Sequence, residues 1–539
     1  MRNLVLLAAV AACITACSKA PEAVATPPVA KAASAAAPAH AGIAWVKPDG
    51  ASLDAVFTQA RADNKPVFLY WGAVWCPPCN QIKATVFNRP DFVERSRAFI
   101  PVYLDGDTPG AQKLATQFNV RGYPTTILFK PDGTELTRLP GEVDAVQYMQ
   151  VLKLGMGATQ PIKETLAAAL SPTDPAGAAL KPDAWRLLAY YAWDTDEAQL
   201  LAKKDVASTV LQLAQKCPPQ EVEAAARLRL RAIVVASQDT KSALDKTAAL
   251  AQVQAILADP ARARESTDIL TNYANELVSV LTRNGSAQHA QLVADLGVAL
   301  DRLASDQGLS KADRLGAVQA KVGLALQDMP KGGKTALAPE LISQAQAAAN
   351  QADQTTTDRY ERQAVIPSAA HLLSDVGLID ASDAMLKAEL PKAVSPYYHM
   401  LVLASNAKLR GDNAASLDWA EKAYVGSMGP ATRMQWGSGY VQKLIELAPQ
   451  DSARIEKAAS QVIGELDAAP ETFYERNRRS LEKMGAQLVS WNTGGKHAAV
   501  VQKLTTQLDG VCAKLPENDS ATQACKGVFA KSGKSAKKA

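Results

Sequence analysis

The sequence has no marked excess of charge of either sign. Its 58 basic and 54 acidic side chains leave a formal net charge of +4 at pH 7, which gives no electrostatic reason to expect a nucleic-acid partner. The five histidines are scattered and lack the spacing of metal ligands, so we expect neither a metal site nor a cofactor. The one local excess of charge, Lys531 to Lys538, is predicted to lie in a disordered tail over residues 531–539.

The N-terminal apolar run, Leu4 to Ala12, is too short to cross a bilayer. It follows Arg2 and precedes small residues before Cys17, a pattern typical of an export signal. The run resembles a lipoprotein signal, in which the cysteine becomes the first residue and carries lipid. We therefore expect residues 1–16 to be a lipoprotein-type signal peptide and Cys17 to be lipidated.

Two other interpretations of this segment stay open. Cleavage before Cys13 would leave an unusually short apolar region, with Ile14 just behind the lipid. An ordinary cleaved signal would make Cys17 incidental. Ser18 after Cys17, rather than aspartate, favours sorting to the outer membrane. We expect the protein on the periplasmic side of a bacterial cell envelope, anchored by lipid to the outer membrane or otherwise periplasmic.

Large apolar side chains are almost absent from residues 18–41, which are mostly Ala, Pro, Val and Lys. Such a segment cannot bury enough apolar surface to offset the entropy cost of ordering it. Residues 17–42 are therefore predicted to be a lipidated cysteine followed by an Ala/Pro-rich tether.

Cysteine is scarce in the remainder of the chain. Export places the protein in oxidising conditions, where disulfides persist. Cys512 and Cys525 flank a polar, Pro-containing loop and are predicted to form a structural disulfide. Cys217 is then left over, either as a buried inert thiol, which we favour, or as a reactive one. The other two cysteines are Cys76 and Cys79.

At 539 residues the chain is too long for one ordinary domain, and residues 43–155 differ in pattern from the rest. They alternate in the order helix, strand, helix, strand, helix, hairpin, helix, which predicts an α/β fold. The apolar run Pro66 to Trp71 suits a central strand. The turn signal Pro131-Asp132-Gly133 joins two further strands, 125–130 and 135–139.

Strand patterns fade beyond about residue 161, where long Ala/Leu-rich stretches with helical periodicity predict an α-helical region over 162–530. Aromatic residues 185, 190, 191 and 193 are expected to pack in a core or dock on the 43–155 unit. Segments beginning at Gly377 and Gly411 are 34 residues apart (411 − 377), and the second resembles a tetratricopeptide helix. We therefore expect an irregular helical array, with tetratricopeptide-like helices over about 365–425.

The run Trp75-Cys76-Pro77-Pro78-Cys79 places two cysteines three residues apart at a predicted helix start. They lie on one helix face, close enough to form a disulfide. Unpaired backbone donors and the helix dipole favour a thiolate at the first cysteine. Cys76 is therefore predicted to be the exposed nucleophile, and Cys79 the more buried cysteine that resolves the mixed disulfide.

The two prolines are tolerated in the first helical turn, where their missing N–H groups would have lacked helical partners. They also remove two donors that could have solvated a thiolate on Cys76. We therefore expect a Cys76 pKa that is only moderately lowered, and a reducing site. A zinc knuckle uses the same cysteine spacing, but no second Cys/His pair lies nearby.

Motifs elsewhere in residues 52–154 agree with this chemistry: Lys65-Pro66-Val67, Asp105 after the second strand, and Val120-Arg121-Gly122-Tyr123-Pro124-Thr125. Together with the cysteine run and the order of elements, they resemble the thioredoxin superfamily. They are most similar to the periplasmic thioredoxin-like domains at the C-terminus of the membrane thiol:disulfide interchange reductases. The resemblance covers roughly a fifth of the chain.

The resemblance implies a thioredoxin fold and a redox-active Cys76–Cys79 disulfide. Trp75, Pro77 and Pro78 would support the two cysteines. Pro124 matches the cis-proline of the family, which packs beside the cysteines and leaves the preceding backbone free to pair with a substrate strand. Tyr123, just before it, is a candidate for setting partner preference.

One position departs from the family. Many members carry an acidic residue six positions before the nucleophile, where it relays a proton for the second cysteine. Tyr70 occupies that position here, between Phe68 and Trp71 on an apolar strand. Proton transfer would then need water or another group, which puts rapid general reductase turnover in doubt.

The sequence thus predicts a cell-envelope thiol–disulfide oxidoreductase that exchanges disulfides with protein partners, as a reductant, with a helical region that recruits those partners. The membrane would be contacted through the lipid anchor, and the oligomeric state stays open. The alternative is a helical scaffold or chaperone-like lipoprotein that uses its thioredoxin-like unit for docking. Disulfide isomerisation, with the helical region holding the substrate, is a third possibility.

Overall fold

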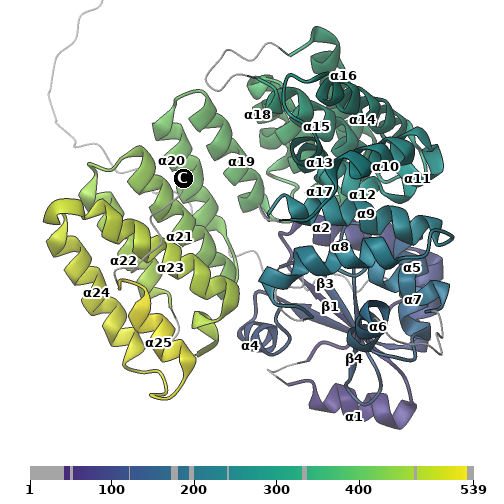
Figure 1. Ribbon diagram of the computed structural model, residues 1–539. Helices are drawn as coiled ribbons and strands as arrows, with labels where there is room; N and C mark the ends of the chain where they lie inside the picture. Colours follow the sequence, from purple (N-terminus) through teal and green to yellow (C-terminus); the bar gives the residue numbers. More distant parts are fainter. Residues whose placement is uncertain are drawn as a thin grey trace, which may run out of the picture. The chain divides into compact units, whose positions relative to one another are not determined.

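The computed structural model describes residues 42–48, 52–120, 122–171, 180–193, 200–238, 242–329, 337–466 and 470–530. The predicted signal peptide, Cys17, the tether up to residue 41, Arg121 and the tail 531–539 lie outside the described residues. The elements described below belong to one unit, residues 39–539 (Figure 1).

The first elements alternate between helix and strand, as predicted. They are α1 (Asp54–Asp63), β1 (Val67–Gly72), α2 (Pro77–Ile82), the π-helical η1 (Lys83–Phe87), α3 (Pro90–Arg95), the 3-10 turn η2 (Ser96–Ala98), β2 (Ile100–Asp105), α4 (Pro109–Gln117), β3 (Thr125–Phe129), β4 (Glu135–Leu139) and α5 (Ala145–Gly157).

The four described strands form one mixed sheet in the order β2-β1-β3-β4. β1 and β2 are parallel, and the β1–β3 and β3–β4 pairs are antiparallel. Val46 forms an isolated parallel bridge with Val102 of β2, so the segment before α1 also lies against this sheet. The predicted thioredoxin-type α/β fold is confirmed.

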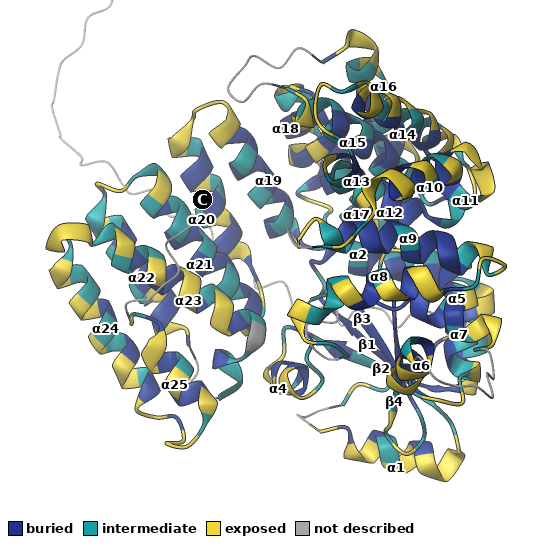
Figure 2. Ribbon diagram, in the orientation of Figure 1, coloured by how far each residue is buried: buried dark blue, intermediate teal, exposed yellow. Residues whose placement is uncertain are grey.

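All residues of the central strand β1 are buried (Figure 2), and its side chains alternate between two apolar clusters. Val67, Leu69 and Trp71 pack in a cluster with α1 and α4. Phe68 and Tyr70 pack in a second cluster with side chains of η1, α3 and α5. The sheet therefore has helices against both faces.

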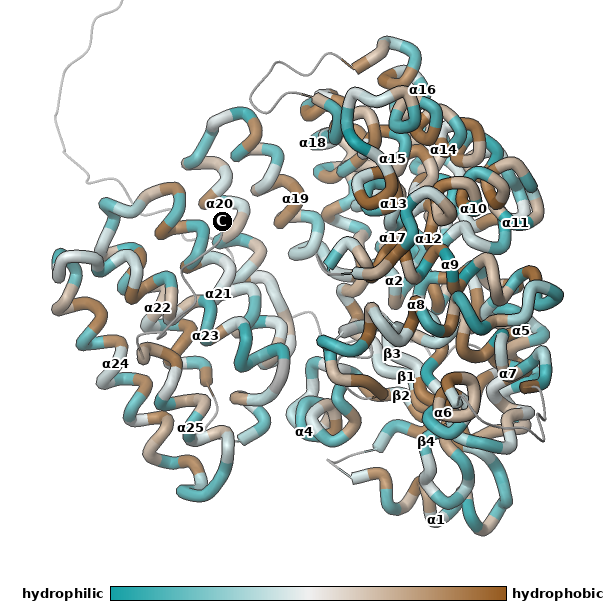
Figure 3. Tube along the Cα trace, viewed as in Figure 1, coloured by the Kyte–Doolittle hydropathy of each residue, from teal (hydrophilic) through white to brown (hydrophobic). Residues whose placement is uncertain are grey.

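The rest of the described chain is helical, as predicted, with apolar and polar residues alternating along most helices (Figure 3). Its first helices are α6 (Ile162–Leu170), α7 (Pro182–Ala189), α8 (Val206–Lys216), α9 (Val222–Ala236), α10 (Lys246–Ala258), α11 (Pro260–Glu265), α12 (Thr267–Asn272), α13 (Ala274–Leu281), α14 (Ala287–Ser305) and α15 (Lys311–Gln327). The later ones are α16 (Pro339–Thr355), α17 (Arg359–Asp375), α18 (Ile379–Glu389), α19 (Pro396–Leu409), α20 (Asn413–Gly426), α21 (Pro430–Leu447), α22 (Ser452–Gly464), α23 (Glu475–Trp491), α24 (Ala498–Cys512) and α25 (Ser520–Gly527).

Helices α6 to α9 share a core with the sheet. The cluster that contains Phe68 and Tyr70 also contains buried side chains from these four helices. The aromatic residues near α7 belong to this cluster, as expected: Trp185, Tyr190, Tyr191 and Trp193. Apolar packing therefore continues without a break from the α/β part into the helical region.

The two segments spaced 34 residues apart begin in the same way. Gly377 and Gly411 both have positive φ, 85° and 79°, and each is followed within two residues by a helix, α18 or α20. Glycine suits this left-handed turn because it has no Cβ. The local similarity is real, while a tetratricopeptide array stays a prediction.

The other cysteines among the described residues form one disulfide and one buried thiol. Cys512 of α24 and Cys525 of α25 are joined in a disulfide. Cys217 is free and buried, and burial raises the pKa of its thiol to about 11. A raised pKa leaves little thiolate, which favours the inert interpretation. No helix among the described residues is both long and apolar enough to span a membrane.

A buried ion pair links α9 to α12. Arg227 and Asp268 approach to 2.8 Å with side chains 1% and 2% exposed, and Arg231 lies 3.4 Å from the same carboxylate. Burial alone would raise the pKa of Asp268, but the two guanidinium groups more than offset it, so its pKa lies below the ordinary value. The ion pair therefore stabilises the fold fully at pH values above the ordinary pKa of aspartate. This contribution is lost as the pH falls through the lowered pKa of Asp268.

Replacing Asp268→Asn should lower the free energy of unfolding at pH 7 by about 3–5 kcal/mol, because two buried guanidinium groups lose their counter-charge. Denaturant unfolding of the purified chain measures this change. Asp418→Asn is the control, since Asp418 pairs with Lys422 at the surface and should change stability by less than about 1 kcal/mol. Equal effects of the two variants would contradict the prediction.

Candidate redox-active site

The two cysteines of the predicted motif form a disulfide at the start of α2. Cys76 is the N-cap residue, and Pro77 and Pro78 occupy the first helical turn. The N–H group of Cys79 donates to Sγ of Cys76 over 3.3 Å. Since prolines carry no N–H, Cys79 supplies the first backbone donor of the helix to this sulfur.

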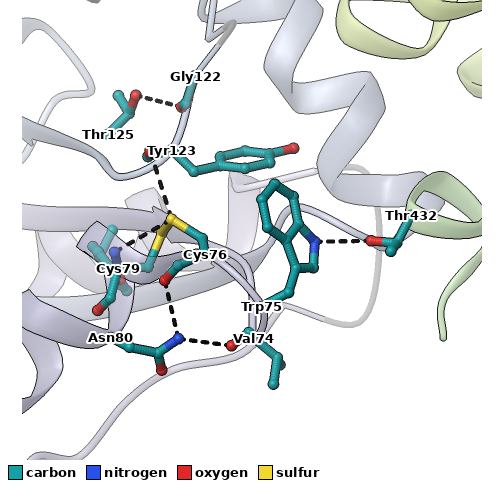
Figure 4. The surroundings of a disulfide bond; sticks show 10 residues. Val74, Trp75, Cys76, Cys79, Asn80, Gly122, Tyr123, Thr125 and Thr432 are labelled. Atoms are coloured by element: carbon teal, nitrogen blue, oxygen red, sulfur yellow. Dashed lines mark hydrogen bonds between the residues drawn. A yellow bond between two sulfur atoms is a disulfide. The ribbon is translucent and has the colours of Figure 1, made fainter. Parts of the chain in front are cut away.

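The backbone of Tyr123, the residue before Pro124, lies beside the disulfide (Figure 4). The Tyr123–Pro124 peptide bond is cis, and the carbonyl oxygen of Tyr123 is 3.7 Å from Sγ of Cys76. The Thr125 hydroxyl donates to the carbonyl of Gly122 over 2.9 Å, which holds the preceding turn. The structure thus brings Cys76, Cys79, Tyr123 and Pro124 together, as the family resemblance implied.

Cys76 is not exposed, contrary to the sequence prediction. Its accessible fraction is 3%, and that of Cys79 is 0%. A helix start ordinarily faces solvent, but here Trp75, Cys76 and Cys79 belong to one apolar cluster with side chains of the C-terminal helices. Residues more than 300 positions away in the sequence therefore contribute to this burial.

Trp75 contacts four residues of those helices. Its indole N–H donates to the Thr432 hydroxyl of α21 over 2.8 Å (Figure 4). Its ring meets Trp436 edge-on, with centroids 4.8 Å apart, and stacks on Tyr398 at 6.1 Å. Arg476 of α23 lies over the same ring, 5.1 Å from its centroid.

Arg476 also lies over Tyr123, 5.6 Å from the ring centroid. Burial lowers the pKa of this guanidinium, and Tyr123 partly opposes the shift. Burial raises the pKa of Tyr123 to about 12. A cation from the helical region therefore lies over both Trp75 and Tyr123, the aromatic side chains near the cysteines.

Asp107, in the loop before α4, links the α/β part to α21. Its Oδ1 accepts the N–H of Thr432 over 2.6 Å. Burial raises the pKa of Asp107 from its ordinary 3.8 to about 7, although the hydrogen bonds from Thr432 act in the opposite direction. This carboxyl group therefore changes its charge near neutral pH.

Tyr70 occupies the position of the family's buried acid. Its hydroxyl donates to the carbonyl of Cys79 over 3.3 Å, and its ring stacks on Tyr103 with centroids 5.7 Å apart. Burial raises its pKa well above the usual range of tyrosine. Tyr70 thus holds the backbone of Cys79 but offers no acidic proton near neutral pH.

A buried lysine, Lys83, lies close to the Tyr70–Tyr103 pair. Lys83 follows Cys79 by one helical turn, is 5% exposed, and has its Nζ 5.5 Å from the ring centroid of Tyr103. Burial lowers its pKa from the ordinary 10.5 to about 8, and Asp105 opposes the shift. Burial likewise raises the pKa of Asp105, while Lys83 and Lys47 act against that shift.

Several residues of the site could not be assigned to it from the sequence: Lys83, Asp107, Tyr398, Thr432, Trp436 and Arg476. Only Lys83 had a local signal, its helical spacing from Cys79. The described residues hold no group of three or more His, Cys, Asp or Glu side chains placed to bind a metal ion.

Residues 53–155 match the family model of the thioredoxin-like domain. In this part the chain is 34% identical over 107 residues to the thiol:disulfide interchange protein DsbD 1 of Pseudomonas aeruginosa, covering 19% of this chain and 18% of that protein. It is 34% identical over 106 residues to DsbD of Yersinia pestis, covering 19% and 17%. It is 33% identical over 90 residues to the H-type thioredoxin of Oryza sativa subsp. indica, covering 16% and 68%.

Through these residues, the chain belongs to the thioredoxin superfamily. The match spans less than a fifth of each of these two DsbD proteins. The thioredoxin-like domain, its Cys76–Cys79 pair and the similarity to DsbD support a thiol:disulfide oxidoreductase.

Lys83 should destabilise the thioredoxin-like domain while it is charged. Its lowered pKa means that the unfolded chain binds more protons, so stability rises as the pH increases through about 8 towards 10.5. Lys83→Met should raise the free energy of unfolding at pH 7 by about 1–3 kcal/mol and remove that rise. Denaturant unfolding at pH 7 and about pH 9.5 tests both expectations, with the exposed Lys153→Met as control. A destabilised variant would contradict them.

Asp107 should give the opposite dependence on pH. Its raised pKa means that the folded chain holds a proton that the unfolded chain has lost, so stability falls as the pH rises from about 4 to about 7. Asp107→Asn keeps an acceptor for Thr432 and should flatten this fall. Thermal melts at about pH 5 and about pH 8 measure it, with the exposed Asp63→Asn as control. An unchanged pH dependence in Asp107→Asn would refute the assignment.

Proposed function

We propose that the protein is a cell-envelope thiol–disulfide oxidoreductase that reduces disulfides in protein partners. The observation that carries the proposal is the Cys76–Cys79 disulfide at the start of α2, beside the cis Tyr123–Pro124 bond. In this proposal Cys76 and Cys79 are the catalytic residues. Trp75, Pro77, Pro78, Tyr123 and Pro124 support them.

The reaction is a two-electron exchange. The Cys76 thiolate attacks one sulfur of a partner disulfide, forming a mixed disulfide and releasing the other partner sulfur as a thiolate. The Cys79 thiol gives its proton to that thiolate and attacks Sγ of Cys76, which breaks the mixed disulfide and frees the second partner sulfur as a thiolate that takes a proton from water. The partner leaves as a dithiol and the chain holds the disulfide seen here. A dithiol protein must then reduce Cys76–Cys79 for the next cycle.

The surroundings of Cys76 support the reducing direction. A strongly oxidising site needs a thiolate that is stabilised by many donors or by a cation beside the sulfur. Arg476 of the helical region lies over the rings of Trp75 and Tyr123, so its charge faces these rings. Pro77 and Pro78 occupy the first two helical positions and carry no N–H group. The backbone N–H of Cys79 donates to Sγ of Cys76 in their place. A moderate preference for the thiolate accordingly favours a stable disulfide and a dithiol that gives up electrons readily.

The proposed location rests on the N-terminal pattern. Residues 1–16 read as an export signal, and Cys17 as a lipidation site. Outer-membrane anchoring through Cys17 is part of the proposal, as is a helical region that recruits and positions protein partners.

A second candidate function is favoured by the burial of Cys76. A helical scaffold or chaperone-like protein could use the thioredoxin-like domain as a docking module, in which case the disulfide need not turn over. The 3% exposure of Cys76 is the observation on its side. The two candidates differ in whether the cysteines are required for activity.

The full chain should catalyse insulin reduction with dithiothreitol as electron donor, and Cys76→Ser should abolish catalysis because the attacking thiolate is gone. The turbidity of reduced insulin measures the rate. Cys217→Ser is a matched control and should keep it, since Cys217 is buried elsewhere. Equal rates for Cys76→Ser and the unmodified chain would favour the scaffold.

Cys79→Ser should accumulate mixed disulfides between Cys76 and partner proteins, because the resolving thiol is missing. Non-reducing gels and mass spectrometry of the trapped species identify these partners. The double variant Cys76→Ser/Cys79→Ser is the control and should trap nothing at this site. Trapping that is equal in both variants would contradict the assigned roles of the two cysteines.

A further inference from the structure

The face of the thioredoxin-like domain that carries the disulfide is covered by three helices of the C-terminal half. Tyr398 comes from α19, Thr432 and Trp436 from α21, and Arg476 from α23. All four contact Trp75, the residue that precedes Cys76. We name helices α19, α21 and α23 the cap.

The cap holds Trp75 through a buried hydrogen bond to Thr432. Thr432 is 1% exposed and Trp75 is 8% exposed, so the 2.8 Å hydrogen bond between them is shielded from solvent. A buried indole N–H that loses its acceptor is left unpaired, which disfavours the closed arrangement.

A second contact fixes the N-terminus of α21. Thr432 donates its backbone N–H to Asp107, and the Asp107 carboxylate lies so close to Gly429 that a Cβ there would come within 1.9 Å of Oδ2. Gly429 also has a φ of +86°, a conformation that favours glycine. The contact therefore depends on a residue without a side chain.

The other side of α2 is covered as well. α17 packs against α2, and the Gln81 amide donates to Asp313 over 3.0 Å and to Ser310 over 3.3 Å at the start of α15. Helices of the helical region thus pack against α2 as well as against Trp75, and Cys76 and Cys79 are 3% and 0% exposed.

Disulfide exchange needs a third sulfur to approach the S–S bond in line. In the closed arrangement Cys76 is 3% exposed and belongs to one apolar cluster with side chains of the cap, which leaves little room for that approach. We propose that the cap is an autoinhibitory element: the Cys76–Cys79 site exchanges slowly, through the fraction of molecules in which α19, α21 and α23 have moved away from Trp75. The full chain therefore keeps a basal insulin-reducing activity that opening of the cap would raise. The proposal adds a control step to the proposed function and rests on that function for its biological meaning.

The test measures access to the disulfide and not turnover. The oxidised full chain is treated with dithiothreitol, samples are quenched with acid, free thiols are labelled, and mass spectrometry follows the Cys76 peptide. The denatured chain supplies the rate of an open disulfide. We expect the native chain to be reduced at least about tenfold more slowly than this reference.

Two variants should open the cap. Thr432→Val keeps the side-chain shape but removes the acceptor of the Trp75 N–H, and should speed reduction of the native chain about tenfold. Trp436→Ala removes the edge-on contact and should act in the same direction. Trp491→Ala is the matched control. Trp491 stacks on His497, and its indole N–H donates to the Pro449 carbonyl. Its loss should leave the rate of reduction unchanged. Circular dichroism checks that each variant is folded.

The result distinguishes this proposal from the proposed function. The cap proposal would be overturned if the native chain were reduced as fast as the denatured one. It would also be overturned if the folded Thr432→Val and Trp436→Ala variants were reduced no faster than the unmodified chain. Faster reduction of both variants without insulin reduction by any of them would support the cap and refute the reductase.

Discussion

Burial of β1 on both faces is the constraint on which the rest of the structure depends. A strand of Val67 to Trp71 exposes large apolar side chains in both directions, so each side needs a helical layer. α1 and α4 cover one side. On the other side α5 is joined by α6 to α9 of the helical region. The thioredoxin-like domain and the helices that follow it therefore share a core.

The same principle, repeated at the end of β1, produces the covered redox site. Trp75 is a large side chain at the surface of a small domain, and its indole finds both an apolar surround and a hydrogen-bond acceptor in the C-terminal helices. Its burial also covers Cys76. The packing of Trp75 against the C-terminal helices thus stabilises the chain and limits access to the Cys76–Cys79 disulfide. Disulfide exchange with a partner would require part of this packing to break.

Chemistry beneath the cysteines differs from the family pattern in a consistent way. Tyr70 replaces the acid and bonds the Cys79 carbonyl, and Lys83 places a buried amine near the tyrosine pair. In place of a carboxylate that accepts a proton, this chain has the Tyr70 phenol, whose pKa is raised, and the Lys83 amine, whose pKa is lowered. The sequence shows the replacement at position 70. The pKa directions follow only from burial, which depends on neighbours distant in the chain.

The sequence by itself determined the α/β order of residues 43–155, the cysteine motif and the helical character of the remainder, because strand alternation, turn residues and helical periodicity are local signals. It also pointed to Pro124 as a neighbour of the cysteines through the family resemblance. Only the tertiary structure decided that Cys76 is buried. Thr432, Trp436 and Arg476 lie 357 to 401 positions from Trp75 in the sequence (432 − 75 and 476 − 75), and a single sequence carries no signal for a contact that side-chain packing alone creates.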